Sequence, residues 1–362
     1  MRAFLWVLEL CLLTACLSPA VEATSTPLPT RPPVTRTPRP TVTPYPTPTR
    51  APTWTPESTL SPTPEAWYLR YSVPSLRERP YGTGQLEIVE QVEENDSFSR
   101  YLIRYPSDNL TIYGYANLPR GAGPFPVIIM LHGRAALDGY ETLKENDEYA
   151  RLYASHGFIV LHPNLRNYPP SDPGENYFLA GMAVDVLNLI ALVKTESGQP
   201  GLLQAAAPAK IGLWAFSMGG ALAWRVLVIS PDIRAAFLYS PMSANDSQNA
   251  AFLAASGTDP EAEKVLTLPA YAFASLSPDN FYPAIQAAVD IHHGTADRAI
   301  PVDWSKKACE ELTRLGKTVH CYYYENSDHV FSGNAGLKLE QRMLNFFTTH
   351  LKNPAPSATP GP

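Results

Sequence analysis

A serine between an apolar run and two glycines is the residue best placed for chemistry. Segment 211–220 reads IGLWAFSMGG and holds Ser217. Small residues two positions either side of a serine let a strand and a helix pack across a sharp turn that projects the hydroxyl. The usual pattern is G-x-S-x-G, and Ala215 replaces its first glycine. A mere helix cap would explain neither the strand nor the glycine pair, so we predict that Ser217 is a nucleophile.

A serine hydroxyl is a weak nucleophile at neutral pH and needs a base. The chain has 8 histidines, and their positions must separate them. His329 follows the apolar segment 321–324 and precedes the last helical stretch, where a loop returns to the carboxyl edge of a sheet. His320 reads as structural, and His292 and His293 end an earlier strand. We therefore predict that His329 is the base.

An acid is needed to orient the base and stabilise the imidazolium. Asp297 lies in the loop immediately after a strand. The resulting chain order of serine, aspartate and histidine is one of those known for such triads. Asp303 and Asp328 compete for the role. We expect Asp303 to cap a helix starting at Trp304 and Asp328, next to His329, to point elsewhere, so Asp297 is the predicted acid.

Two hydrogen-bond donors should face the developing oxyanion. The backbone N–H of Met218 is the first candidate, and the N–H of Arg134 in the loop HGRA at 132–135 is the second. The Arg134 side chain either leans into the pocket, favouring an anionic or strongly polar substrate group, or points to solvent. His132 is expected to be structural or part of this oxyanion loop.

The elements around these residues alternate between strands and helices. β-branched and aromatic segments at 86–92, 98–105 and 111–117 predict an antiparallel opening. Short apolar runs then predict strands buried on both faces, and 183–193 keeps helical spacing. These runs are 127–131, 158–161, 211–214, 236–239 and 289–292. We predict an α/β fold with a mostly parallel, doubly wound sheet and antiparallel N-terminal strands.

Together these motifs resemble the α/β-hydrolase superfamily, and within it the prolyl oligopeptidase catalytic domain and its dienelactone hydrolase-like relatives. The resemblance covers about 98–351. It rests on YGY at 113–115 with LP at 118–119, GPFP at 123–126, LHG at 131–133, the serine turn, HGTADRAIP at 293–301 and DH at 328–329. It implies an acyl-enzyme route in which the serine attacks a carbonyl, the histidine shuttles the proton and water releases the acid.

Two features depart from that family. Residues 65–85 are too few for the β-propeller that its peptidases usually carry, so peptidase specificity is unsupported. The long connection 241–282 predicts a small cap, with a helical part at 249–255. Its aromatic residues either line an apolar acyl site or pack the cap: Tyr271, Phe273, Phe281 and Tyr282.

The N-terminus reads as an export signal. Residues 1–23 contain one positive charge and an apolar run, interrupted by Glu9, that ends in LTAC at 13–16. LTAC resembles a bacterial lipobox, which predicts lipidation of Cys16 and a membrane anchor. The alternative is a secretory signal cut after Ala20 or Ala23.

Residues 24–64 are almost entirely Thr, Pro, Arg and Ser, which predicts an extended, disordered linker.

The remaining chain is assigned to one catalytic domain, 65–352, and a disordered tail, 353–362. In an exported domain, Cys309 and Cys321 predict one disulfide, and the alternative is two buried thiols. The net charge of −6 argues against nucleic-acid binding. The sequence lacks metal-ligand spacing, and we expect neither metal nor cofactor.

The leading function is an exported or surface-tethered serine hydrolase that acts on small carboxylic esters or peptides. A peptidase without a propeller is the nearest variant. A non-catalytic binding protein on a hydrolase fold and an acyltransferase with the same triad are the other classes. The sequence leaves the oligomeric state open.

Overall fold

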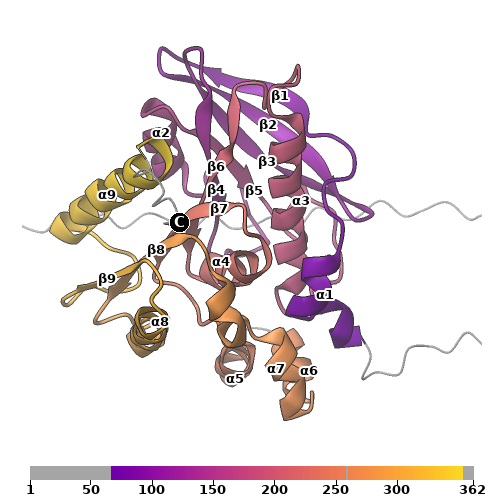
Figure 1. The fold of residues 1–362 in the computed structure, drawn as a ribbon, viewed down its shortest axis with the longest axis vertical. Helices are drawn as coiled ribbons and strands as arrows, with labels where there is room; N and C mark the ends of the chain where they lie inside the picture. The colour runs from indigo at the N-terminus through magenta and orange to yellow at the C-terminus, as the bar shows by residue number, and fades with distance from the viewer. Residues whose placement is uncertain (1–66, 258–259, 354–362) are drawn as a thin grey trace, which may run out of the picture. The chain divides into compact units, whose positions relative to one another are not determined.

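The computed structural model describes residues 67–257 and 260–353, which contain one nine-stranded sheet (Figure 1). The strands pair in the order β1-β2-β3-β5-β4-β6-β7-β8-β9. Their bounds are β1 Glu87–Glu94, β2 Phe98–Ser107, β3 Leu110–Pro119, β4 Phe125–Leu131, β5 Ile159–Pro163, β6 Ala206–Phe216, β7 Ile233–Tyr239, β8 Ala288–Gly294 and β9 Val319–Tyr324. Each predicted strand is present, and most are longer than their apolar runs.

The pairing of the strands changes once, at β5, from antiparallel to parallel, as the sequence predicts. β1, β2, β3 and β5 pair antiparallel, whereas β5, β4, β6, β7, β8 and β9 pair parallel. The inner parallel strands bury both faces, which explains their unbroken apolar runs. Register pairs Leu131 with Ala215 and Phe216 with Tyr239. The carboxyl ends of these strands therefore meet at one edge, where such folds place their ligands.

Helices cover both faces of the sheet (Figure 1). Side chains of α1, α3, α4 and α8 share one buried cluster, whereas those of α2 and α9 share the other. Their bounds are α1 Val73–Glu78, α2 Asp147–Ser155, α3 Ala180–Glu196, α4 Met218–Ile229, α8 Val302–Arg314 and α9 Gly333–Phe347. The 3₁₀ helix η1 Trp67–Tyr71 precedes them, and the π-helix η4 Thr348–Lys352 ends the described chain. The fold is thus the predicted doubly wound α/β arrangement.

The connection after β7 forms a separate group of short helices. These are α5 Asp246–Ser256, α6 Pro260–Leu266, η2 Ala270–Ala272, α7 Phe273–Leu276 and η3 Pro278–Ala284. Arg225 of α4 and Asp246 of α5 form a buried ion pair that ties this insertion to the central helix. Burial of Asp246 raises its pKa to about 6, although Arg225 opposes the shift. We call this segment, 241–284, the cap insertion.

Three of the four cap aromatics pack in this structure. Tyr282 is buried against Trp224, with ring centroids 5.4 Å apart, and Arg77 lies over the Phe281 ring. Phe273 is partly buried against the core. For these three, packing of the cap fits better than an acyl site, whereas Tyr271 is 65% exposed.

A disulfide joins α8 to β9. Cys309 and Cys321 are bonded, with Cα atoms 6.4 Å apart. Helix α8 buries Ala308 and Leu312 beside it. The bridge therefore links the helix after the Asp297 loop to the strand before the His329 loop.

Several predicted features lie outside the described residues. They are the signal or lipobox region 1–23 with Cys16, the linker 24–64 and the tail from 354 onward. Within the described ranges, no helix is long and apolar enough to cross a membrane.

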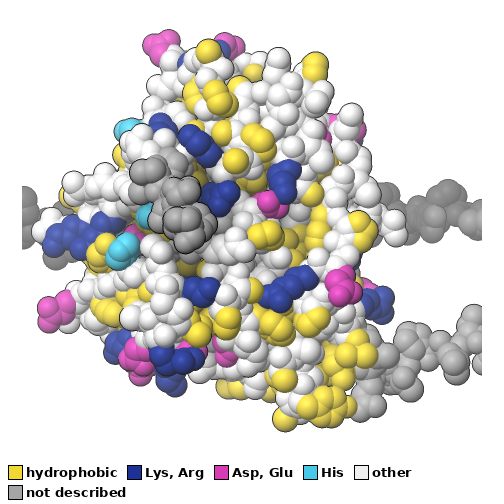
Figure 2. Space-filling model, viewed as in Figure 1, with side chains coloured by type: hydrophobic (Ala, Val, Ile, Leu, Met, Phe, Trp, Pro, Cys, Tyr) yellow, Lys and Arg dark blue, Asp and Glu magenta, His cyan; other side chains and the backbone are white. Residues whose placement is uncertain are grey.

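On the face shown in Figure 2, Lys and Arg side chains lie singly or in small groups between hydrophobic and uncharged ones.

Candidate active site

Ser217 occupies a strained turn between β6 and α4. Its backbone has φ 54° and ψ −115°, a positive φ that non-glycine residues seldom adopt. Glycines make the turn possible, because a Cβ on Gly219 would lie 2.2 Å from the Leu131 carbonyl oxygen. A Cβ on Gly220 would lie 2.4 Å from that of Pro241. Such strain at a polar residue is typical of functional sites.

His329 lies against this serine. Its Nε2 is 3.0 Å from Ser217 Oγ, within hydrogen-bond distance. The loop after β9 holds the histidine in place, since Ser240 Oγ donates to the His329 carbonyl at 3.0 Å. The Phe216 ring packs on the imidazole with centroids 4.9 Å apart. The structure thus brings together two residues far apart in the chain.

Asp297 completes the line. Its Oδ2 is 2.8 Å from His329 Nδ1, and its side chain is fully buried. Its Oδ1 accepts from the backbone N–H groups of Ala299 and Ile300, each at 2.8 Å. Burial alone would raise the pKa of Asp297. Hydrogen bonds from His293, His329 and Ile300 outweigh it and hold the pKa well below its ordinary value.

His293 is a site residue that the sequence reasoning assigned only to a strand end. Its Nε2 lies 3.0 Å from Asp297 Oδ2 and 3.1 Å from the Ile300 carbonyl oxygen, and both are acceptors. Its Nδ1 lies 2.7 Å from Ser305 Oγ, which can donate. Because both partners of Nε2 are acceptors, Nε2 carries a proton and donates it. The i, i+4 spacing of His293 and Asp297 across a tight turn was the available signal.

The competing carboxylates are engaged elsewhere. Asp328 accepts from the backbone N–H of Arg298 at 3.0 Å and forms an ion pair with its guanidinium. The expectation that Asp303 caps a helix starting at Trp304 is wrong. Helix α8 begins at Val302, and Asp303 lies in its first turn, where it pairs with Lys306 at 2.9 Å. Acidic side chains are favourable there because of the helix dipole.

The loop after β4 lies against the serine, as the oxyanion prediction requires. A Cβ on Gly133 would come within 3.2 Å of Ser217 Cβ, so only glycine fits comfortably. His132 Nδ1 is 2.7 Å from the Gly133 carbonyl oxygen, and its Nε2 is 2.9 Å from that of Asn164. In a trans peptide the Arg134 N–H points away from the Gly133 carbonyl. His132 is buried and lies against the peptide that carries this N–H.

A cavity of about 600 Å³ opens beside Met218. Part of its wall is apolar and part is polar, with Arg134 and Glu261 among the lining side chains. The Arg134 side chain lines this cavity and is also exposed to solvent. Both alternatives for it, leaning into the pocket and pointing to solvent, therefore apply in part. The remaining lining residues are Ala135, Ala136, Leu137, Asn167, Tyr168, Asn176, Leu179 and Met182.

No metal centre accompanies the site in the part of the chain that the structure describes. No group of three or more His, Cys, Asp or Glu side chains there could hold an ion. What the arrangement offers is a hydroxyl, an imidazole and a buried carboxylate in hydrogen-bonded sequence. These are the groups that nucleophilic acyl transfer requires.

Residues 128–335 match the model of the alpha/beta hydrolase family. The chain belongs to this family. The match contains the serine turn, the acid loop and the histidine loop. The resemblance to the α/β-hydrolase superfamily, which we drew from the sequence, is therefore confirmed.

Two curated relatives match over short stretches. One is a type 0 chlorophyllase of Chenopodium album, 36% identical over 78 residues, 20% of each chain. The other is an acetyl esterase of Xylanibacter ruminicola, 32% identical over 94 residues, 26% of this chain and 20% of the relative. The match thus spans about a fifth of the length of either relative.

Solved structures resemble the chain more extensively. An acetyl xylan esterase of Thermoanaerobacterium sp. has a TM-score of 0.57 at 15% identity, covering 77% of this chain and 91% of the other. An acylaminoacyl peptidase of Pyrococcus horikoshii has a TM-score of 0.57 at 20% identity, and the match covers 74% of this chain and 44% of the peptidase. A structure from Klebsiella pneumoniae described as a dienelactone hydrolase has a TM-score of 0.52 at 18% identity, and the match covers 70% of this chain and 99% of the other. At these identities the likeness concerns the fold.

Proposed function

We propose that this protein is a serine hydrolase that cleaves small carboxylic esters through an acyl-enzyme on Ser217. One observation carries the proposal. Ser217 Oγ, His329 and the Asp297 carboxylate form a continuous line with contacts of 3.0 and 2.8 Å. These distances lie within the range expected of a nucleophile, its base and the orienting acid.

The mechanism follows from the atoms in that line. His329 Nε2 takes the proton of Ser217 as Oγ attacks the ester carbonyl. The imidazolium then gives this proton to the leaving alcohol, and the C–O bond breaks to leave an acyl-serine. Water, deprotonated by His329, attacks the acyl-serine, and the imidazolium returns the proton to Ser217 Oγ as the acyl–oxygen bond breaks and the acid leaves. Asp297 stays ionised throughout, because its pKa is held low.

Charge on the carbonyl oxygen needs donors fixed in advance. The Met218 N–H follows directly from the strained Ser217 turn and opens α4, so the helix dipole favours negative charge there. The Arg134 N–H is the second proposed donor, in the peptide whose carbonyl oxygen contacts His132. Loss of one such donor typically lowers kcat by about 10²- to 10³-fold.

Esters are preferred over peptides in this proposal. The names of one curated relative and one solved structure specify acetyl esters. The likeness to the acylaminoacyl peptidase covers only 44% of that protein. The cavity beside Met218 is lined by the residue after the nucleophile but by none of the triad, and its walls are partly apolar and partly polar, which suits a small acyl group on a polar alcohol.

Hydrolysis of p-nitrophenyl acetate and of proline-containing and acylated peptides tests this choice. We expect turnover of the ester to exceed that of every peptide. Ser217→Ala should lower kcat for the ester by several orders of magnitude, as for other triads. Faster cleavage of a peptide would favour the peptidase alternative. Unchanged ester turnover in S217A would contradict the proposal.

We also infer that the protein is exported and tethered to a membrane through Cys16. The apolar run before LTAC and the Thr/Pro composition of 24–64 support this inference. So does the Cys309–Cys321 disulfide, since such bonds persist mainly in oxidising compartments. In a bacterial host, the protein should partition into the detergent phase of Triton X-114. Cys16→Ser should move it to the aqueous phase, and detergent partitioning unchanged by this substitution would contradict lipidation.

A further inference from the structure

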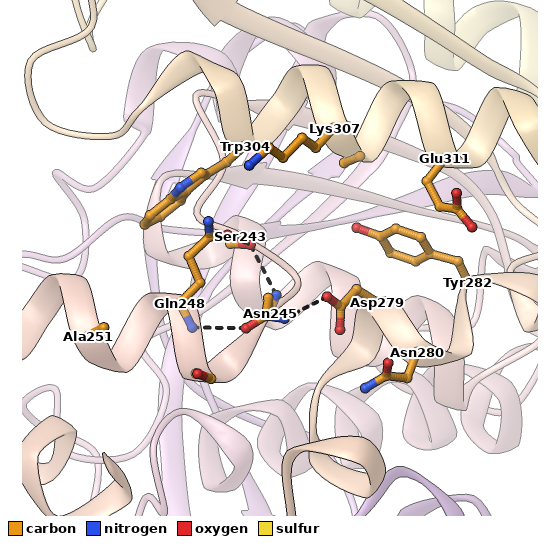
Figure 3. A pocket seen from close by; sticks show the side chains of 12 residues that line it. Ser243, Asn245, Gln248, Ala251, Asp279, Asn280, Tyr282, Trp304, Lys307 and Glu311 are labelled. Atoms are coloured by element: carbon orange, nitrogen blue, oxygen red, sulfur yellow. Dashed lines mark hydrogen bonds between the residues drawn. The ribbon is translucent and has the colours of Figure 1, made fainter. Parts of the chain in front are cut away.

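A second cavity, of about 560 Å³, lies between the cap insertion and α8. Its walls come from α5 and the turn before it, from η3 and from one face of α8 (Figure 3). Ser217, Asp297 and His329 are not among its lining residues. Its volume falls within the range of roughly 300–1,000 Å³ found for small-molecule sites.

One helix face supplies an aromatic ring and two charged groups. Trp304, Lys307 and Glu311 are spaced i, i+3 and i+7 on α8, which places them on one side of the helix. Phe252 of α5 contacts Trp304 edge-on, with centroids 5.3 Å apart and planes at 77°. The Phe252 ring therefore packs against the indole at the cavity wall.

The opposite wall is ordered by its own hydrogen bonds. Ser243 Oγ donates to Gln248 Oε1 at 2.7 Å, so the amide oxygen is engaged and the amide nitrogen is left to face the cavity. Asn245 Oδ1 accepts from the Gln248 backbone N–H at 2.9 Å, and Asn245 Nδ2 donates to Asp279 Oδ2 at 2.8 Å. A wall fixed in this way loses little side-chain entropy when a ligand binds.

The polar groups converge on the space between the walls. Figure 3 shows Gln248 and Trp304 projecting towards each other at one end, and the Tyr282 hydroxyl directed inward at the other. The amide of Asn280 also lines the cavity, and its Nδ2 donates to the Phe273 carbonyl at 3.1 Å. The cavity thus offers donors and acceptors together.

The cavity is lined by one cation, Lys307, and two carboxylates, Asp279 and Glu311, and Arg314 outside the lining neutralises Glu311. Glu311 forms an ion pair with Arg314, one turn away on the same helix, at 2.5 Å. The cation of Lys307 offsets the anion of Asp279 across the cavity. A charged ligand would meet a like charge as well as an opposite one, so the electrostatics favour a neutral ligand.

We propose that this cavity is a binding site for a neutral carbohydrate. A sugar hydroxyl both donates and accepts, which matches the amides of Gln248 and Asn280 and the hydroxyl of Tyr282. The apolar C–H face of a sugar ring matches the indole of Trp304. Binding here uses none of the triad, so the site is a second function beside hydrolysis.

Calorimetric titration of the full-length S217A protein tests the site without turnover. The ligands are maltotriose, cellotriose and xylotriose, with trigalacturonate and the glucosamine trimer as charged analogues. We expect one-site, saturable binding of at least one neutral trisaccharide and weaker binding of both charged analogues.

Three variants locate the binding. Gln248→Leu, Trp304→Leu and Tyr282→Phe each remove one proposed contact, and we expect at least one to raise Kd about tenfold, the loss expected for one such contact. Lys306→Met is the matched control, since Lys306 neighbours Lys307 on α8 but is paired with Asp303 outside the cavity. Thermal melts confirm that each variant is folded.

Each of several results would overturn the assignment. These are no saturable binding of any neutral trisaccharide, preference for a charged analogue, or a Kd unchanged in all three variants. Loss of binding in Arg134→Ala would place the sugar in the cavity beside Met218 instead. Because the titrations use S217A, their outcome is independent of whether the wild-type protein hydrolyses esters.

Discussion

Asp297 is the most heavily bonded side chain of the site. Four donors reach its carboxylate, from the imidazoles of His329 and His293 and the amides of Ala299 and Ile300. Each hydrogen bond to a charged group contributes on the order of 1.5–3 kcal/mol. This buried carboxylate therefore bears on both orientation of the base and stability of the fold.

Asp297→Asn affects both roles, and kinetics and unfolding measure them separately. We expect kcat to fall by about 10⁴-fold at neutral pH, the loss known for this change in another triad, because an amide cannot hold the same tautomer of His329. Stability should also change with pH. The folded pKa of Asp297 lies below its unfolded value, so its stabilisation is present above about pH 4 and is lost as the pH falls further.

Urea unfolding at pH 5 and pH 3 measures the second effect. The advantage of the wild type over D297N should be about 2 kcal/mol at pH 5 and smaller at pH 3. An advantage that grows on acidification would mean that Asp297 is not ionised in the folded protein.

His293 acts through Asp297 and is a positioning residue in our account. His293→Phe removes the donor at 3.0 Å from Asp297 Oδ2. We expect kcat to fall by about ten- to a hundredfold, the equivalent of one charge-assisted hydrogen bond, with KM little changed. His293→Gln keeps an N–H donor and should recover most of the loss. Equal defects in both variants, or a rise in KM alone, would argue for a purely structural role.

At the scale of single residues, the sequence was informative where chemistry and position coincide. Ser217, Asp297 and His329 each lie just beyond a strand end, and the structure brings them into contact. His293 was missed because it lies within β8, and its contact to Asp297 depends on the turn that follows. Its residue type and strand position alone carry no such information.

At the scale of elements, the disulfide stabilises the two segments that flank the acid and base loops. It closes a loop with a sequence separation of 12 between Cys309 and Cys321. For a loop of this size, chain-entropy arguments give a stabilisation of about 3 kcal/mol.

The double substitution Cys309→Ser with Cys321→Ser should therefore lower the unfolding free energy by about 3 kcal/mol. Reduction of the wild type with dithiothreitol should have the same effect and should leave the double variant unaffected. Equal stability of both proteins in guanidinium unfolding would show that the bridge contributes nothing.

Element boundaries were predicted less well than element types. The helix expected at 249–255 is α5, but its start at Asp246 depends on the Asn245 cap. The start of α8 is at Val302 instead of Trp304, and Pro301 stands at the N-cap without a side-chain cap hydrogen bond. Local side-chain contacts such as the Asn245 cap help to decide the ends of helices and are hard to read from hydrophobic spacing.

At the scale of the whole molecule, alternating apolar runs and helical stretches sufficed to predict the sheet. Burial of both faces forces such runs, and the turn residues between them separate the strands. The cavity between α5 and α8 was not predictable in the same way. Its walls join segments that are distant in the chain, and its polarity follows from side chains that read as ordinary surface residues.

The central claim is that Ser217 is a nucleophile activated by His329, held 3.0 Å away. A fluorophosphonate reacts far faster with a serine activated in this way than with an ordinary serine hydroxyl. Wild-type protein should gain one adduct, and peptide mapping by mass spectrometry should locate it on Ser217, whereas S217A should remain unmodified. An unlabelled wild type, or an adduct of equal yield on another residue in both proteins, would contradict the account.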